Sequence, residues 1–146
     1  IIIMKNILEN LIFDHIGIAT ESIEKSVESF MILGYKVVSK TITDLNQDVK
    51  VCFMKKNKSP KIELIEPNSK NSPINTMLKK NRGIIPYHFC YRVLNMEKTL
   101  LDLSSEGFIK ITKPMASPAF NDNNVCFLYK VNIGVIEVVE INGCND

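Results

Sequence analysis

The sequence repeats itself, and its only two histidines occupy equivalent places in the repeat. His15 begins the apolar segment HIGIA, and His88 begins the apolar segment HFCYRV 73 residues later. Further along, residues 62–66 (IELIE) resemble residues 136–140 (IEVVE) at an offset of 74. A period of this length is too long for the unit of a solenoid, so we expect two copies of one module packed against each other.

The hydrophobic pattern predicts the same order of elements in both copies. In the first copy we expect a strand at 11–20, a helix at 21–33 and strands at 36–42, 49–56 and 61–66. Gly34 and Gly107 are expected to end the two helices. Between the copies, Ser72 and Pro73 predict the N-cap and first turn of a short helix that reaches about Lys80.

These elements predict an α+β fold in a single domain at 11–142. Module 1 covers about 11–66, the linker with its short helix about 67–83, and module 2 about 87–142. Each module is a βαβββ unit. A chain of 146 residues that is 45% hydrophobic is long enough to bury one shared core.

Charge and cysteine content limit the classes of partner. Eighteen basic and 16 acidic residues give a net charge of +2, which indicates neither nucleic acid nor a membrane surface as a partner. The four cysteines form no CxxC pair and mostly lie in apolar runs, which favours a reducing, cytoplasmic setting. Asn6, Glu9 and Asn10 interrupt the apolar start, so we expect no signal peptide. The partner is expected to be a small molecule.

Strand geometry places the ionisable residues of the repeat on one face. Side chains alternate along a strand, so His15 lies on the face opposite Ile16 and Ile18. Glu63 and Glu137 each lie between apolar residues in mid-strand, and a buried carboxylate needs a cationic partner. A lone histidine on a strand is more often a hydrogen-bonded structural residue, but the symmetry favours a ligand. The set His15, Glu63, His88 and Glu137 therefore predicts a site for one divalent metal ion.

Other polar residues near the repeat are open to two interpretations. Arg92 shares the strand face of His88, where it could hold a substrate carboxylate or phosphate, or it could end the strand in solvent. Tyr87 could line the substrate site or could be an aromatic residue at the start of the strand. Glu66 and Glu140 lie on the opposite strand face from the predicted ligands and are expected to be solvated. Lysines 55, 56, 58 and 61 are expected to form a solvated hairpin.

Five motifs together resemble the vicinal oxygen chelate superfamily, over residues 12–141. They are HIGIA from His15, IELIEP from Ile62, NSPI from Asn71, YHFC from Tyr87 and GVIE from Gly134. Within the superfamily the chain is most similar to single-domain glyoxalase I-like and methylmalonyl-CoA epimerase-like proteins. The resemblance implies an open β-cup around one divalent ion, with Ni²⁺, Co²⁺ or Zn²⁺ suited to the imidazole and carboxylate donors, and a homodimer is expected. It assigns the ligands to His15, Glu63, His88 and Glu137.

The resemblance also implies a metal-dependent lyase or isomerase in which Glu63 and Glu137 move a proton between carbon and carboxylate. A glyoxalase I-like activity on the hemithioacetal of a 2-oxoaldehyde and a thiol is the first expectation. The alternative is an epimerase of acyl-CoA thioesters. Epimerase-like members usually have His-His where this chain has Tyr87-His88, and they carry a His-Pro-Lys that is missing before the last strand. A non-catalytic binding or resistance protein is a third possibility, since fold alone does not fix function.

Overall fold

The computed structural model describes residues 11–141, which form ten strands, three α-helices and one 3-10 helix. The first module contains β1 (Ile12–Thr20), α1 (Ile23–Ile32), β2 (Lys36–Val37), β3 (Ile42–Asp44), β4 (Val49–Lys55) and β5 (Lys61–Pro67). After α2 (Asn75–Lys80), the second contains β6 (Ile84–Val93), α3 (Met96–Ser105), β7 (Ile109–Lys110), β8 (Met115–Ser117), η1 (Pro118–Phe120), β9 (Asn123–Lys130) and β10 (Gly134–Glu140). The signal-peptide prediction and Cys144 fall outside the described residues.

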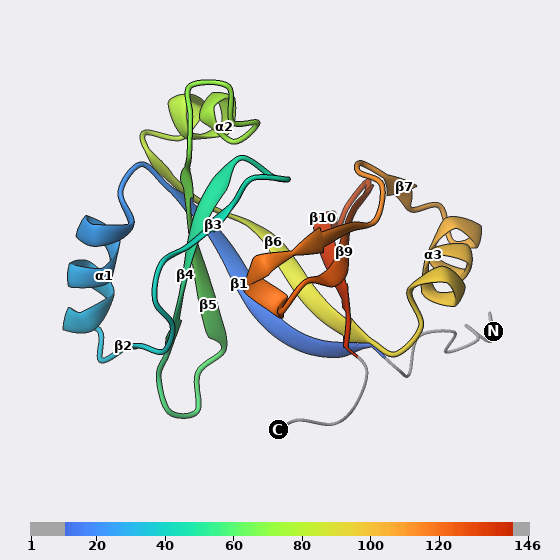
Figure 1. The fold of residues 1–146 in the computed structure, drawn as a ribbon, viewed down its shortest axis with the longest axis horizontal. Coiled ribbons are helices and arrows are strands. Elements are labelled where there is room, and N and C mark those ends of the chain that lie inside the picture. Colours follow the sequence, from blue (N-terminus) through green and yellow to red (C-terminus); the bar gives the residue numbers. More distant parts are fainter. Residues whose placement is uncertain (1–10, 142–146) are drawn as a thin grey trace.

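The strands form one mixed sheet in the order β2-β4-β5-β1-β6-β10-β9-β7, with β3 added to β4 and β8 added to β9. The two modules join where β1 pairs antiparallel with β6, while β1 pairs parallel with β5 and β6 with β10. The sheet does not close, and α1 and α3 lie at opposite ends of the molecule (Figure 1). This arrangement confirms the predicted α+β fold with an open cup. No helix in the described range is long and apolar enough to cross a membrane.

Equivalent hydrogen bonds show that the repeat extends to local structure. The Phe53 N–H donates to the Ser39 hydroxyl at 2.9 Å, and the Phe127 N–H donates to the Thr112 hydroxyl at 3.0 Å. In each module a side-chain oxygen thus takes the place of a strand carbonyl. The prediction of one strand at 36–42 is wrong, because this segment is divided into the short strands β2 and β3.

The C-terminal ends of α1 and α3 agree with the prediction, whereas the start of α2 differs from it. Gly34 and Gly107 follow α1 and α3 with φ of 91° and 89°, a left-handed conformation that suits glycine. The linker helix α2, however, begins at Asn75, and its N-cap is Ile74 rather than Ser72. The Ser72 carbonyl instead accepts a hydrogen bond from the Asn75 N–H at 3.2 Å, so this segment forms a turn before the helix.

Three apolar clusters cover the two faces of the sheet. One lies beneath α1 and comprises Ile18, Ile23, Cys52, Met54, Ile62 and Leu64. Another lies beneath α3 and comprises Val93, Met96, Leu103, Cys126, Leu128, Ile136 and Val138. The third includes Ala19, Phe53, Ile65, Cys90 and Val139, and fills part of the concave face. Cys52, Cys90 and Cys126 are buried and free, as predicted for reduced cysteines.

The two modules also meet through their β3 and β8 segments. The Ser117 hydroxyl donates to Asp44 Oδ2 at 3.1 Å, and Asn46 Nδ2 donates to the Ala116 carbonyl at 2.9 Å. Asp44 and Ser117 are 73 residues apart and therefore equivalent in the repeat. Both are buried, so this bridge is a fixed part of the fold.

Candidate metal centre

The two histidines lie on the central strands, and each follows a β-bulge. The pairing of β1 with β6 skips Asp14 on β1 and Tyr87 on β6. Each skipped residue immediately precedes a histidine, so the bulges are equivalent in the repeat. A bulge bends the strand and redirects nearby side chains. Tyr87 and His88 can therefore both reach the interior although they are neighbours in the sequence.

The structure brings the four predicted ligands together in one buried cluster. His15 Nε2 lies 2.9 Å from Glu63 Oε2, and His88 Nε2 lies 3.1 Å from Glu137 Oε2. The crossed pairs are separated by 3.5 and 3.6 Å, and the two Nε2 atoms by 3.3 Å. All four side chains are buried, and their donor atoms lie within 4.8 Å of one another.

This arrangement fits a divalent metal ion. Ligand atoms that share one ion at about 2.1 Å lie roughly 3–3.5 Å apart, which is the spacing found in this cluster. The buried Glu137 Oε2 has no partner among the described residues other than the two histidine Nε2 atoms, at 3.1 and 3.5 Å, although a buried acceptor normally has a hydrogen-bond donor of its own. Two imidazoles and two carboxylates are a donor set that suits Ni²⁺, Co²⁺ or Zn²⁺.

The charges in the cluster favour an ionised Glu63. Burial alone would raise the pKa of Glu63, but the charge of His15 and hydrogen bonds with both histidines lower that pKa to about 2. Burial likewise opposes protonation of His15, yet the charge of Glu63 and the hydrogen bond with Asp14 raise the pKa of His15 well above its usual value. A proton on His15 and a metal ion are thus alternative cations for the same carboxylates.

Asp14 orients His15 and is not among the residues predicted from the sequence. Because a carboxylate only accepts, His15 Nδ1 donates to Asp14 Oδ2 at 2.7 Å and leaves Nε2 free to face the cluster. Lys61 Nζ at 3.0 Å and Arg92 Nε at 3.4 Å also contact Asp14. An acidic residue directly before a strand histidine is the signal that could have identified it. His88 Nδ1 has no such partner within residues 11–141.

His88 is positioned by packing against Gly17. A Cβ atom built on Gly17 would overlap the His88 ring, so the imidazole occupies the space that any other residue would fill. The repeat places Cys90 at the position equivalent to Gly17, beside His15. The two halves of the cluster therefore have the same ligand types, but different contacts orient the two histidines.

Two cavities lie on either side of the cluster, and aromatic rings separate each cavity from the ligand residues. The His15-side cavity, of about 470 Å³, is lined in part by Asp14, Phe53, Lys55, Lys61, Arg92 and Phe120. The rings of Phe53 and Phe120 contact His15, with centroids 5.5 and 5.9 Å from its own. Arg92 thus lies beside the candidate centre, on the predicted face. Lys55, Lys56 and Lys58 are exposed around the β4–β5 turn, as expected for a solvated hairpin, whereas Lys61 is half-buried. Lys55 and Lys61 also line this cavity.

The His88-side cavity, of about 430 Å³, is lined in part by Ile74, Met77, Tyr87, Met115, Phe127 and Val135. The rings of Tyr87 and Phe127 contact His88, with centroids 4.5 and 5.3 Å from its own. Burial and the charges of Glu63 and Glu137 raise the pKa of Tyr87 well above its usual value, so its hydroxyl stays protonated. The structure therefore places Tyr87 next to the cluster and not at a solvent-exposed strand end.

The prediction that Glu66 and Glu140 are solvated is wrong. Both point away from the metal cluster as expected, but they are half-buried and not solvated. Glu66 Oε2 accepts a hydrogen bond from the Ile23 N–H at 2.8 Å, and Glu140 Oε2 accepts one from the Met96 N–H at 2.7 Å. Each carboxylate therefore caps the N-terminus of the helix in its own module.

Comparison with known proteins places the chain in a family. The family model described as the Glyoxalase/Bleomycin resistance protein/Dioxygenase superfamily matches residues 14–127. The chain belongs to this superfamily, which the motifs of the sequence predict.

Its curated relatives include mitochondrial methylmalonyl-CoA epimerases. That of Dictyostelium discoideum is 27% identical over 128 residues, which cover 87% of this chain and 76% of the relative. That of Homo sapiens is 28% identical over 126 residues, which cover 86% of this chain and 70% of the relative.

Solved structures share the fold. A hypothetical protein of Bacillus halodurans C-125 superimposes with a TM-score of 0.81 and 27% identity, covering 94% of this chain and 99% of its own. Methylmalonyl-CoA epimerase of Mycobacterium tuberculosis gives a TM-score of 0.77 and 23% identity, covering 90% of this chain and 88% of its own.

Proposed function

We propose that the protein is a metal-dependent epimerase that removes and returns a proton at the carbon next to a thioester carbonyl. The observation that carries the proposal is the buried cluster in which two carboxylates from equivalent strands, Glu63 on β5 and Glu137 on β10, face two histidines. The relatives named methylmalonyl-CoA epimerase support an acyl-CoA thioester as the substrate class. The glyoxalase I-like activity expected first from the sequence has no support among these relatives.

In this proposal His15, Glu63, His88 and Glu137 hold one divalent ion, with Ni²⁺, Co²⁺ and Zn²⁺ as candidates. When bound, the ion supplies Lewis-acid stabilisation of negative charge on the substrate oxygens. Asp14 keeps His15 in the tautomer whose Nε2 faces the cluster.

The two carboxylates divide the proton transfer between them. Because Glu63 and Glu137 are related by the pseudo-twofold of the repeat, they approach the reacting carbon from opposite sides. One carboxylate takes the proton from the carbon, and the electron pair is delocalised into the thioester carbonyl. The other carboxyl group, which carries a proton at the start of the cycle, then donates that proton to the opposite face, which inverts the configuration and leaves this group ionised. General-base catalysis of this kind contributes about 10²–10⁴-fold to the rate.

Deuterium exchange tests the reaction. In D₂O, the metal-saturated protein should introduce deuterium at the α-carbon of methylmalonyl-CoA or of a homologue with a longer alkyl group. Glu137→Gln should slow the exchange by about 10²–10⁴-fold even in protein that retains its metal, because an amide can coordinate an ion but cannot act as a base. The hemithioacetal of methylglyoxal and glutathione is the comparison substrate. Deuterium in its product and in neither thioester would contradict the epimerase assignment.

Arg92 is proposed to bind an anionic group of the substrate. It lines the His15-side cavity with Lys55 and Lys61, and these three cations outnumber the single carboxylate of Asp14. Arg92→Met should therefore raise KM several-fold and change kcat much less, because the cation contacts the substrate equally before and during the reaction. Steady-state kinetics with methylmalonyl-CoA measure both constants. An unchanged KM would indicate that Arg92 serves only its contact with Asp14.

A further inference from the structure

The two cavities occupy equivalent places on the two sides of the metal cluster. The repeat relates a large part of their linings, since positions 73 or 74 residues apart recur in both. The equivalent pairs of similar residues are Val38 and Ile111, Ser39 and Thr112, and Phe53 and Phe127. The equivalent pairs of unlike residues are Asp14 and Tyr87, Lys61 and Val135, Ala119 and Asn46, and Phe120 and Gln47. The fold therefore offers the same type of space twice.

The chemistry of the two cavities nevertheless differs. The charged residues Asp14, Lys61 and Arg92 line the His15-side cavity. In the repeat these residues correspond to Tyr87, Val135 and Ala19, respectively. Tyr87 and Val135 line the His88-side cavity. Because the same backbone positions accept charged side chains in one module, the fold does not impose an apolar lining in the other. The lining is mostly apolar, with Asn46, Gln47, Asp48 and Thr112 as its polar members, and this composition is a property of the sequence.

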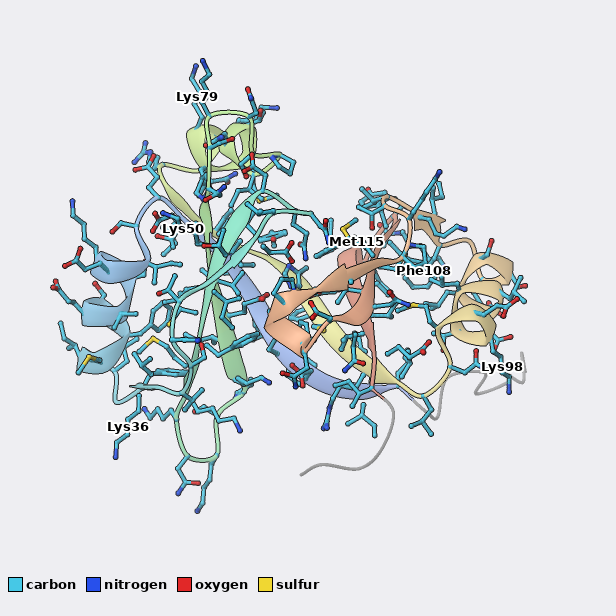
Figure 2. The ribbon with its side chains drawn as sticks, in the orientation of Figure 1. Lys36, Lys50, Lys79, Lys98, Phe108 and Met115 are labelled. Carbon is cyan, nitrogen blue, oxygen red and sulfur yellow. The ribbon has the colours of Figure 1, made fainter. Side chains whose placement is uncertain are left out.

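The His88-side cavity is much larger than a methyl group. Its volume of about 430 Å³ compares with roughly 30 Å³ for one water molecule, which is similar in size to a methyl group. Its apolar walls come from α2, β6, β8, β9 and β10, and Met115 from β8 lies between the two halves of the molecule (Figure 2). Met77 and Met115 are flexible, so they can adapt to chains of different shape.

We propose that the His88-side cavity binds the side chain of the substrate's acyl group, and that this side chain is an apolar chain of several carbons. The proposal rests on the proposed function, because it names the substrate class of the same centre. Tyr87 and Phe127 connect the cavity to the cluster, since both rings contact His88. An acyl chain in the cavity would therefore lie one aromatic ring away from the ligands.

Binding of unreacted thioesters tests the assignment. Calorimetric titration of the Co²⁺-saturated protein with acetyl-CoA, butyryl-CoA and hexanoyl-CoA should show affinity that rises with chain length. Full burial of each added methylene predicts an increase of up to about fourfold. Equal affinity for the three thioesters, or binding of none, would overturn the assignment.

A matched pair of variants locates the effect. Ile111→Trp adds bulk to the His88-side cavity and should reduce the chain-length dependence to less than twofold between acetyl-CoA and hexanoyl-CoA. Val38→Trp adds the same bulk at the equivalent position of the His15-side cavity and should retain the dependence. Ile111 and Val38 are 53% and 51% exposed, so both variants are expected to fold. Val135→Lys is a second variant that should reduce the chain-length dependence. It places a lysine in the His88-side cavity at the position equivalent to Lys61.

The deuterium experiment separates this inference from the proposed function. Chain-length-dependent binding without α-carbon exchange would contradict the proton transfer and leave the cavity assignment standing. Exchange with length-independent binding would contradict the cavity assignment alone. Loss of the length dependence in Val38→Trp as well as Ile111→Trp would place the acyl chain elsewhere.

Discussion

At the scale of single residues, the candidate centre depends on a position that has no side chain. Gly17 leaves the space that the His88 ring occupies, and its equivalent, Cys90, carries a side chain beside His15. The four ligands repeat in the sequence, but the residues that orient them do not. His15 is fixed by a hydrogen bond to Asp14, whereas His88 is fixed by packing.

Gly17→Ala should therefore release the metal. The added methyl group overlaps the His88 ring, so the imidazole must move and one ligand is lost. Metal analysis after dialysis against a chelator should show most of the ion removed, as in His88→Ala. Cys90→Ala is the matched control, since it removes atoms beside His15 and should retain the metal. Full metal retention in Gly17→Ala would mean that His88 is not needed as a ligand.

At the scale of elements, each module uses the end of its last strand to hold the start of its helix. Glu66 at the end of β5 accepts from the first N–H of α1, and Glu140 at the end of β10 accepts from the first N–H of α3. A carboxylate at this place satisfies an unpaired donor and interacts favourably with the helix dipole. The arrangement ties each helix to the strand that carries a candidate ligand three residues earlier.

Replacement of these carboxylates should reduce stability and spare the metal. Glu140→Ala should lower the free energy of unfolding by about 1–2 kcal/mol, and Glu140→Gln by less, because the amide oxygen still accepts a hydrogen bond. Urea denaturation measures the change, and metal analysis should find the ion retained in both variants. Loss of metal from Glu140→Gln comparable with that from Glu137→Ala would contradict the division of roles along β10.

At the scale of the whole molecule, the modules are held together by the β1–β6 pairing and by the contact between Asp44 and Ser117. Asp44 also accepts hydrogen bonds from the backbone and side chain of Gln47, at 3.1 and 3.0 Å. The buried carboxylate thus has several donors, and each would lose a partner if the side chain were removed.

Asp44→Ala should consequently destabilise the protein by about 1–3 kcal/mol, since buried donors are left without acceptors. Ser117→Ala removes one donor and leaves Asp44 with its other partners, so a smaller loss is expected. Thermal and urea unfolding of both variants test the comparison. Equal and negligible effects would show that the bridge between β3 and β8 contributes little to the joining of the modules.

The sequence by itself determined the two-module α+β fold and the convergence of His15, Glu63, His88 and Glu137. Internal repetition implies a pseudo-twofold axis, and strand periodicity assigns each side chain to a face of the sheet. Both features can be recognised in the order of residues alone. The same patterns did not give the division of the strand expected at 36–42, because that depends on a side-chain hydrogen bond between β4 and Ser39.

The tertiary structure alone decided how the ligands are supported and what surrounds them. The bulges at Asp14 and Tyr87 arise from the register between β1 and β6, which brings together residues 64 to 80 positions apart. The Glu66 cap likewise joins residues 43 positions apart. Cavity linings combine segments from both modules, so their polarity follows from packing rather than from any single stretch of sequence. Such contacts carry no local periodicity, and only the folded chain reveals them.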